Sequence, residues 1–247
     1  MSSIRSITAS TPVPIDLVNK IGIDGVNEIL AVLWKGYDEL RKDPSASISL
    51  SSEEDDITQD WFVKVQRIWD SRNRATCICL NQVVPHHQWG DRTFKKAKGR
   101  KSPTIDFCFR DWDTANSYFG AECKNLYAHE PKKVERYVDT GVCNYTSGRY
   151  GSQSSQSSMI GYVLSGDITD IVEQLRKEII KEKPIANLVR AMTVPTPQYR
   201  SIHTRKLDNT EITIHHLFFN FVGECPRKCV NANLRNDDVR VTLSQNC

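Results

Sequence analysis

Two neighbouring segments of the sequence have the character of buried β-strands, yet charged residues interrupt both of them. Residues 104–112 and 118–127 are apolar over most of their length and rich in β-forming side chains. Asp106 lies within the first segment, and Glu122 and Lys124 lie within the second. Because an unpaired buried charge is expensive, these groups require a salt bridge, a bound metal ion or both. The fold is therefore expected to bring the three charges together.

The spacing of the charged residues supports that expectation. Side chains two residues apart on a strand point to the same side of the sheet, so Glu122 and Lys124 emerge together while Cys123 points away. Residues 113–116 (Asp-Thr-Ala-Asn) favour a turn, which makes the two segments a hairpin and places Asp106 on the neighbouring strand. Two carboxylates on adjacent strands can hold a divalent cation, which neutralises a phosphodiester and activates water. Lys124 would contact the phosphate, or would position or deprotonate the attacking water if nearby positive charge lowered its pKa.

Asp106, followed by Glu122, Cys123 and Lys124, resembles the signature of the PD-(D/E)xK nuclease superfamily, which includes many restriction endonucleases. In that family the elements run helix, three strands, helix, strand, and the resemblance covers roughly residues 53–165. It implies an α/β (α+β) fold that is restriction-endonuclease-like, with a mixed central β-sheet flanked by helices. It also implies Mg²⁺, which Mn²⁺ can replace, held by Asp106, Glu122 and the backbone carbonyl of Cys123.

Many members of this family place one more acidic residue on the first helix. The resemblance implies this catalytic role for Glu54, with Glu53 as the open alternative. A second Glu-x-Lys sequence, Glu130-Pro131-Lys132, is expected to lie in a loop, because proline disrupts a central strand. The context of an apolar strand therefore separates the candidate site from a chance tripeptide.

Hydrophobic periodicity predicts the other elements of the chain. Helical spacing of apolar residues indicates helices over residues 15–40, 57–72 and 168–181. β-Forming segments indicate further strands over residues 75–84, 159–164 and 211–222. Two segments are less regular: residues 131–150 suit helix in part, and the Ser/Gln tract 152–158 is expected to be an exposed loop.

A chain of 247 residues with 39% apolar content can bury the core of one elaborated domain. We expect an N-terminal helical extension (residues 1–52), a nuclease core (53–182) and a strand-rich C-terminal extension packed on that core (183–247). No apolar run approaches the ~18 residues that span a bilayer, and the first residues do not form a signal peptide. A cytoplasmic protein without a membrane partner is therefore expected.

The net charge of +3 gives little support for a polyanionic partner, so that argument depends on local clustering. Basic residues gather just before the strand that bears Asp106, where they would add phosphate affinity without sequence information. They are Arg92, Lys95, Lys96, Lys98, Arg100 and Lys101. A solvated loop is the alternative interpretation of this basic segment.

Four residues further along the chain are weaker candidates for nucleic-acid contacts. Arg136, Arg149, Tyr145 and Tyr150 would contact phosphates or stack on bases, with ordinary packing as the alternative for the aromatic pair. Arg149 is the one retained as a predicted nucleic-acid-binding residue.

Other chemistry is less well supported by the sequence. The pairs His86-His87 and His215-His216 are adjacent, so on a strand the two rings of each pair point to opposite faces. Cys225, Cys229 and Cys247 lack the four recognisable ligands of a structural zinc site. No cysteine has the neighbouring base that a cysteine hydrolase requires.

The function expected from the candidate residues is a Mg²⁺-dependent endonuclease acting on DNA, while RNA stays open as a substrate. The family resemblance alone implies a setting in restriction or anti-phage defence. The alternative is a catalytically silent nuclease-fold subunit that binds nucleic acid or assembles a larger defence or repair complex. A helicase or ATPase partner and a homodimer are both compatible with the sequence.

Overall fold

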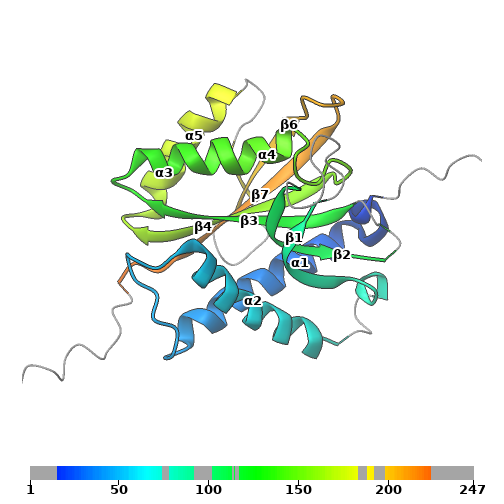
Figure 1. Cartoon of the computed structure of the whole chain (residues 1–247), viewed down its shortest axis with the longest axis horizontal. Coiled ribbons are helices and arrows are strands. Elements are labelled where there is room, and N and C mark those ends of the chain that lie inside the picture. Colours follow the sequence, from blue (N-terminus) through cyan, green and yellow to red (C-terminus); the bar gives the residue numbers. More distant parts are fainter. Residues whose placement is uncertain are drawn as a thin grey trace, which may run out of the picture.

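The computed structural model of the chain describes residues 16–73, 78–91, 102–112, 114, 117–182, 188–191 and 198–223. The described residues form three layers, with a central β-sheet between two groups of helices (Figure 1). The helical elements are α1 (Leu17–Lys42), α2 (Glu54–Ser71), a short 3-10 turn η1 (Ile78–Leu80), α3 (Pro131–Arg136), a π-helical segment η3 (Tyr137–Val142), α4 (Cys143–Thr146) and α5 (Ile168–Glu182). The strands are β1 (Val84–Gly90), β2 (Thr104–Arg110), β3 (Tyr118–Tyr127), β4 (Gln156–Ser165), β5 (Val189–Ala191), β6 (Gln198–Thr204) and β7 (Glu211–Asn220).

The seven described strands form one mixed sheet in the order β1-β2-β3-β4-β7-β6-β5. Strands β1, β2 and β3 pair antiparallel, β3, β4 and β7 pair parallel, and β7, β6 and β5 pair antiparallel. The parallel pair β3–β4 needs a crossover connection, which α3, η3 and α4 supply on one face of the sheet (Figure 1). The predicted α/β class and mixed sheet are confirmed.

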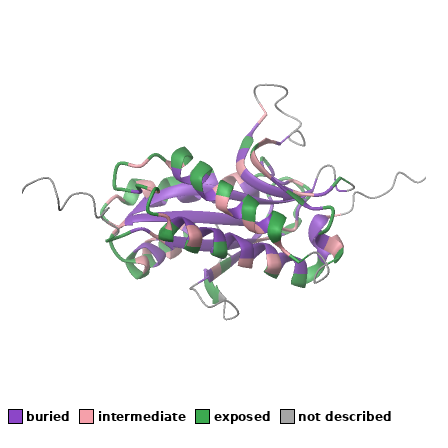
Figure 2. Cartoon of the chain, turned by 90° about the horizontal axis from the view of Figure 1, so that it is seen from below, coloured by how far each residue is buried: buried purple, intermediate pink, exposed green. Residues whose placement is uncertain are grey.

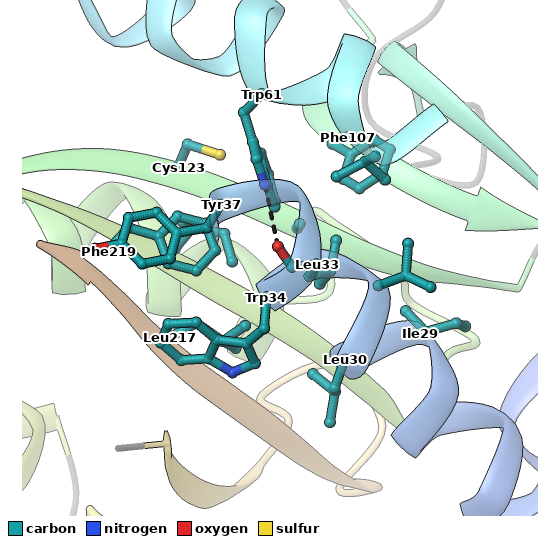
Figure 3. Close-up of a cluster of buried hydrophobic side chains, with 14 of the residues drawn as sticks. Ile29, Leu30, Leu33, Trp34, Tyr37, Trp61, Phe107, Cys123, Leu217 and Phe219 are labelled. Carbon is teal, nitrogen blue, oxygen red and sulfur yellow. Dashed lines mark hydrogen bonds between the residues drawn. The ribbon is translucent and has the colours of Figure 1, made fainter. Parts of the chain in front are cut away.

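Helices α1 and α2 cover one face of the sheet and share a core with it (Figure 3). The indole N–H of Trp61 on α2 donates to the carbonyl of Leu33 on α1 at 3.2 Å. Tyr37 of α1 stacks on Phe219 of β7 with ring centroids 4.5 Å apart. The helix predicted over residues 15–40 is confirmed as α1, and the contacts of β7 join the end of the described chain to its beginning.

The other face of the sheet is covered by α3, η3, α4 and α5 (Figure 1). Their inward side chains, among them Tyr137, Val138 and Leu175, are buried against the strands. Seen from below, the central strands are buried along most of their length while the outer sides of the helices are exposed (Figure 2). The helix predicted over residues 168–181 is confirmed as α5, and the partly helical segment 131–150 is confirmed as α3, η3 and α4.

Most predicted strands are confirmed, but the first one is displaced. The predictions for residues 104–112, 118–127, 159–164 and 211–222 correspond to β2, β3, β4 and β7. The prediction of a strand over residues 75–84 is wrong where the structure describes it: η1 lies there, and β1 begins only at Val84. Strand β1 lies at the edge of the sheet and includes Pro85, which an edge position tolerates. An edge strand that is only partly buried lacks the apolar pattern on which the prediction depended.

The prediction of an exposed Ser/Gln loop over residues 152–158 is confirmed only in part: residues 152–155 lie in a loop with Gln153 exposed, but the prediction is wrong for residues 156–158 and for the burial of Ser154. Strand β4 begins at Gln156, and Ser154, Ser157 and Ser158 are fully buried. The backbone N–H of Tyr118 donates to the Ser154 hydroxyl at 3.0 Å, and the Ser158 hydroxyl donates to the carbonyl of Gly120 at 3.0 Å. Serine is small, and Ser154 and Ser158 find backbone partners here, so a polar, repetitive composition is compatible with burial.

Within the described ranges, no helix is long and apolar enough to cross a membrane. The predicted turn 113–116 lies largely outside the described residues, although β2 and β3 pair antiparallel as a hairpin requires. The predicted basic residues Lys95, Lys96, Lys98, Arg100 and Lys101, together with Arg92 and the cysteines 225, 229 and 247, also lie outside the described residues.

Candidate functional site

The candidate site begins where β2 and β3 stop pairing. Their backbone register ends at Phe107 opposite Ala121. Two residues further along β3, the backbone N–H of Cys123 donates to Oδ2 of Asp106 at 2.7 Å. A buried backbone N–H requires an acceptor, and elsewhere in the ladder a carbonyl of the neighbouring strand accepts it. Here the Asp106 carboxylate accepts the N–H of Cys123 instead. The separation of the strands thus brings a carboxylate to the edge of β3.

Glu54, the first residue of α2, continues this pattern. Its Oε2 accepts the backbone N–H of Asn125 at 3.0 Å, and the side-chain amide of Asn125 donates to the carbonyl of Ser52 at 2.9 Å. Glu53 is exposed and has no such contact with β3 in the described structure. Of the two acidic residues that the sequence left open, the structure brings Glu54 to the other predicted site residues.

Lys124 lies at the centre of the cluster and donates to three oxygens. Its Nζ is 2.8 Å from Oε1 of Glu122, 3.0 Å from Oε1 of Glu54 and 2.5 Å from the carbonyl oxygen of Cys123. Glu122 and Lys124 are each only 5% exposed. The predicted side-by-side placement of Glu122 and Lys124 on β3 is confirmed, and all four predicted catalytic residues converge.

Burial dominates the electrostatics of this cluster. Desolvation raises the pKa of Glu122 to about 8, and the neighbouring charge of Asp106 adds to the rise. Desolvation likewise raises the pKa of Asp106 to about 6, against the opposing effects of Lys124 and the Cys123 N–H. Burial alone would lower the pKa of Lys124, but the surrounding carboxylates raise it above its usual value. With these carboxylates around it, Lys124 is therefore an ammonium.

The oxygens of this cluster fit a hard divalent cation. Oε2 of Glu122 is buried and has no hydrogen-bond partner among the described residues. It lies in a set of carboxylate and backbone carbonyl oxygens, which are the donors that Mg²⁺ prefers, and Mg²⁺ commonly uses one or two protein carboxylates and retains waters. No group of three or more His, Cys, Asp or Glu residues within the described ranges has the arrangement of a ready metal site. At present the ammonium of Lys124 bridges Glu54 and Glu122.

A chain of buried hydroxyls holds α2 against β3 behind these oxygens. The Thr58 hydroxyl donates to the carbonyl of Glu54 at 2.8 Å and lies 3.0 Å from the hydroxyl of Tyr162 on β4. The Tyr162 hydroxyl donates to Sγ of Cys123 at 3.3 Å. These contacts fix the first turn of α2, and with it Glu54, relative to the strand that carries Glu122.

A cavity of about 380 Å³ lies beside the cluster, and of the four predicted catalytic residues it is lined by Glu54 and Lys124 but not by Asp106 or Glu122. Asn125 also lines it, and the first turn of α2 forms one wall. Lys133 and Arg136 on α3 line the opposite side. Asn125 and Lys133 were not predicted from the sequence; the only signal for Asn125 was a third polar residue in an otherwise apolar strand.

The remaining predicted residues are Arg149, Tyr145 and Tyr150, and the basic segment 92–101. Arg149 is exposed and precedes Tyr150, whose hydroxyl donates to the carbonyl of Thr104 at the start of β2. Tyr145 and Tyr150 are buried, so the hypothesis that they stack on bases is wrong and their packing interpretation holds. The basic segment 92–101 cannot be placed relative to the site, because it lies outside the described residues.

The histidine pairs behave as the sequence predicted. His87 stacks against Phe62 of α2, whereas His86 contacts Trp89, which packs on the opposite face of the sheet. His216 faces Tyr137, and the Tyr137 hydroxyl lies 2.9 Å from Nδ1 of His216. Burial lowers the pKa of His216 well below its usual value, so the ring is neutral and belongs to the core.

Comparison of the whole chain with protein-family models, with curated protein sequences and with solved structures found no match. The geometry of Asp106, Glu122 and Lys124 is therefore the main support for a functional proposal.

Proposed function

We propose that this chain is a metal-dependent nuclease that hydrolyses phosphodiester bonds of DNA. One observation carries the proposal: Asp106, Glu122, Lys124 and the Cys123 carbonyl meet where β2 and β3 separate, and Lys124 connects this cluster to a neighbouring cavity that is open to solvent. A salt-bridge network with a purely structural role needs neither a cavity beside it nor a buried carboxylate oxygen without a partner. This cluster has the cavity at Lys124 and, among the described residues, the unpartnered oxygen on Glu122.

The order of elements supports a restriction-endonuclease-like arrangement of this fold. Helix α2, strands β1 to β3, the crossover through α3 to α4, and strand β4 follow one another along the chain. This is the order helix, three strands, helix, strand that the PD-(D/E)xK resemblance implies. Helix α1 and strands β5 to β7 add to both ends of that sequence of elements.

In the proposed reaction, each residue acts where the fold places it. Asp106, Glu122 and the Cys123 carbonyl would hold Mg²⁺, which when bound supplies charge neutralisation and a more acidic water. As an ammonium, Lys124 donates hydrogen bonds that would orient the attacking water or hold a phosphate oxygen. Glu54 accepts from Lys124 and so limits where the ammonium can move.

The direct test is cleavage of a plasmid and of labelled oligonucleotides in Mg²⁺. We expect wild type to cut and the variants Glu122→Gln and Lys124→Ala to lose at least ~100-fold in rate, the usual loss for a group that stabilises or activates at the reaction centre. Glu130→Gln is the matched control, because Glu130 belongs to the second Glu-x-Lys sequence and is expected to leave the rate unchanged.

Two outcomes would contradict the proposal that the chain is a nuclease with this active site. Equal cutting by wild type and Glu122→Gln would place the activity elsewhere. Binding of nucleic acid without cutting by wild type, in Mg²⁺ and in Mn²⁺, would favour the silent binding or assembly subunit. The bonds that tie Lys124 to three oxygens are the observation that favours this second candidate.

A further inference from the structure

The cavity beside the carboxylates has two walls of opposite charge. On one side, the first turn of α2 presents Glu53, Asp55 and Asp56, all exposed. On the other side, α3 presents Lys133 and Arg136. Lys124 and Glu54 also line the cavity, so a ligand that enters between the walls reaches these two residues of the candidate site.

The basic wall is free to bind an anion. Lys133 is partly buried, and its Nζ lies 5.6 Å from the centre of the Tyr127 ring, which holds the side chain against β3. Arg136 is exposed. Neither residue makes an ion pair with any other part of the chain that the structure describes. Their charges are therefore available to phosphates, which guanidinium and ammonium groups bind well.

The acidic wall limits what else can enter. A cavity of about 380 Å³ lies at the low end of the range that holds one small ligand, so it has room for roughly one nucleotide. A duplex brings a second row of phosphates and twice the charge per unit length of a single strand. Glu53, Asp55 and Asp56 would repel that second row, whereas one strand can follow the basic wall alone.

We propose that this cavity receives one nucleic-acid strand, with Lys133 and Arg136 on its phosphates, and that the acidic turn of α2 excludes a second strand. The inference rests on the proposed function and names its substrate class. That class is single-stranded nucleic acid and frayed ends, in preference to intact duplex.

The test measures binding without turnover. Fluorescence anisotropy in EDTA compares a labelled single-stranded oligodeoxynucleotide with a duplex of the same sequence, using the full chain. We expect at least ~10-fold tighter binding of the single strand, with the salt dependence that phosphate contacts impose. The double variant Lys133→Ala/Arg136→Ala is expected to weaken that binding ~10-fold and to reduce the salt slope by about 1–2.

Two comparisons make the test specific to the cavity. Lys132→Ala is the matched control, because Lys132 is the neighbour on α3 that does not line the cavity, and it is expected to bind as wild type. The double variant Asp55→Asn/Asp56→Asn is expected to bind duplex about threefold more tightly than wild type does. Its preference for the single strand over the duplex should therefore be smaller. Melting curves of each variant establish that the surface changes leave the fold intact.

Equal affinity for duplex and single strand would overturn the inference, as would equal losses for Lys132→Ala and the Lys133/Arg136 double variant. Failure of the nuclease is separable from this result. A protein that prefers single strands but does not cut retains the inference and loses the proposed function. A protein that cuts duplex and single strand equally well retains the function and loses the inference.

Discussion

At the scale of single residues, Glu122 gives the main support for the proposal that this cluster is a site and not only a salt bridge. It is 5% exposed, shares one oxygen with Lys124 and has no partner for the other among the described residues. An arrangement built for stability would satisfy both oxygens, since a half-satisfied buried carboxylate is costly. The same burial disfavours the ionised form of Glu122 and so raises its pKa.

This cost makes stability depend on pH. The folded pKa of Glu122, about 8, lies above its usual value of 4.5, so the folded protein binds a proton that the unfolded chain releases. The resulting stabilisation is complete below about pH 4.5 and is lost as pH rises to about 8. In EDTA, Glu122→Gln should match wild type near pH 5 and exceed it at pH 8.5 by at least ~1 kcal/mol, or about 2–4 °C.

Thermal melts of wild type, Glu122→Gln and the partly exposed control Glu130→Gln at both pH values check this prediction. Comparing variants at one pH removes the contribution of the buried histidines, whose lowered pKa values act equally in all three proteins. A Glu122→Gln protein that is less stable than wild type at pH 8.5 would show that Glu122 is satisfied as an ion.

The sequence was sufficient for some of these residues and not for others. Alternation along one strand placed Glu122 and Lys124 on the same face, because that periodicity is local. The sequence could not decide whether Glu53 or Glu54 joins the site, because that depends on how α2 is rotated against β3. The same holds for Lys133, which reaches the cavity only through the packing of α3.

At the scale of elements, the site depends on the first turn of α2 being held at the edge of β3. Thr58, Tyr162 and Cys123 form a buried chain of contacts from that helix through β4 to β3. No residue in this chain faces the cavity. Its role is to position Glu54.

Removing one hydroxyl from this chain should affect both stability and the site. We expect Tyr162→Phe to cost ~1 kcal/mol, or about 2–4 °C in melting temperature, and to weaken divalent-cation binding severalfold. Tyr137→Phe is the matched control, since it removes a buried hydroxyl that contacts His216 instead. It should cost similar stability while leaving cation binding unchanged. Equal effects of both variants on cation binding would refute the positioning role.

The elements that the sequence predicted well are those buried on one side or both. Strands β2, β3 and β7 and helices α1 and α5 each bury a continuous apolar face, and periodicity detects such faces. Strand β1 is partly exposed at the sheet edge, and the first residues of β4 are buried serines. Neither carries an apolar pattern, so only tertiary contacts define them.

At the scale of the whole molecule, one sheet joins segments that are distant in sequence. Strand β7 pairs with β4 and lies inside the sheet, and its Phe219 contacts Trp34 and Tyr37 of α1 and Trp61 of α2. The chain before residue 52 and the chain after residue 183 therefore share a core with the segment that carries the site. This sheet sets the separation of β2 from β3 on which the proposed cation pocket depends.

The most direct test of the account is the binding of Mn²⁺ by the full chain. Titration calorimetry at pH 8.5, above the pKa of both Asp106 and Glu122, should show one saturable site in wild type and in Glu130→Gln. Asp106→Asn and Glu122→Gln should each weaken that site by at least ~10-fold, since each removes a proposed ligand. Absence of saturable binding in wild type, or unchanged affinity in both ligand variants, would contradict the claim that these two carboxylates form a cation site.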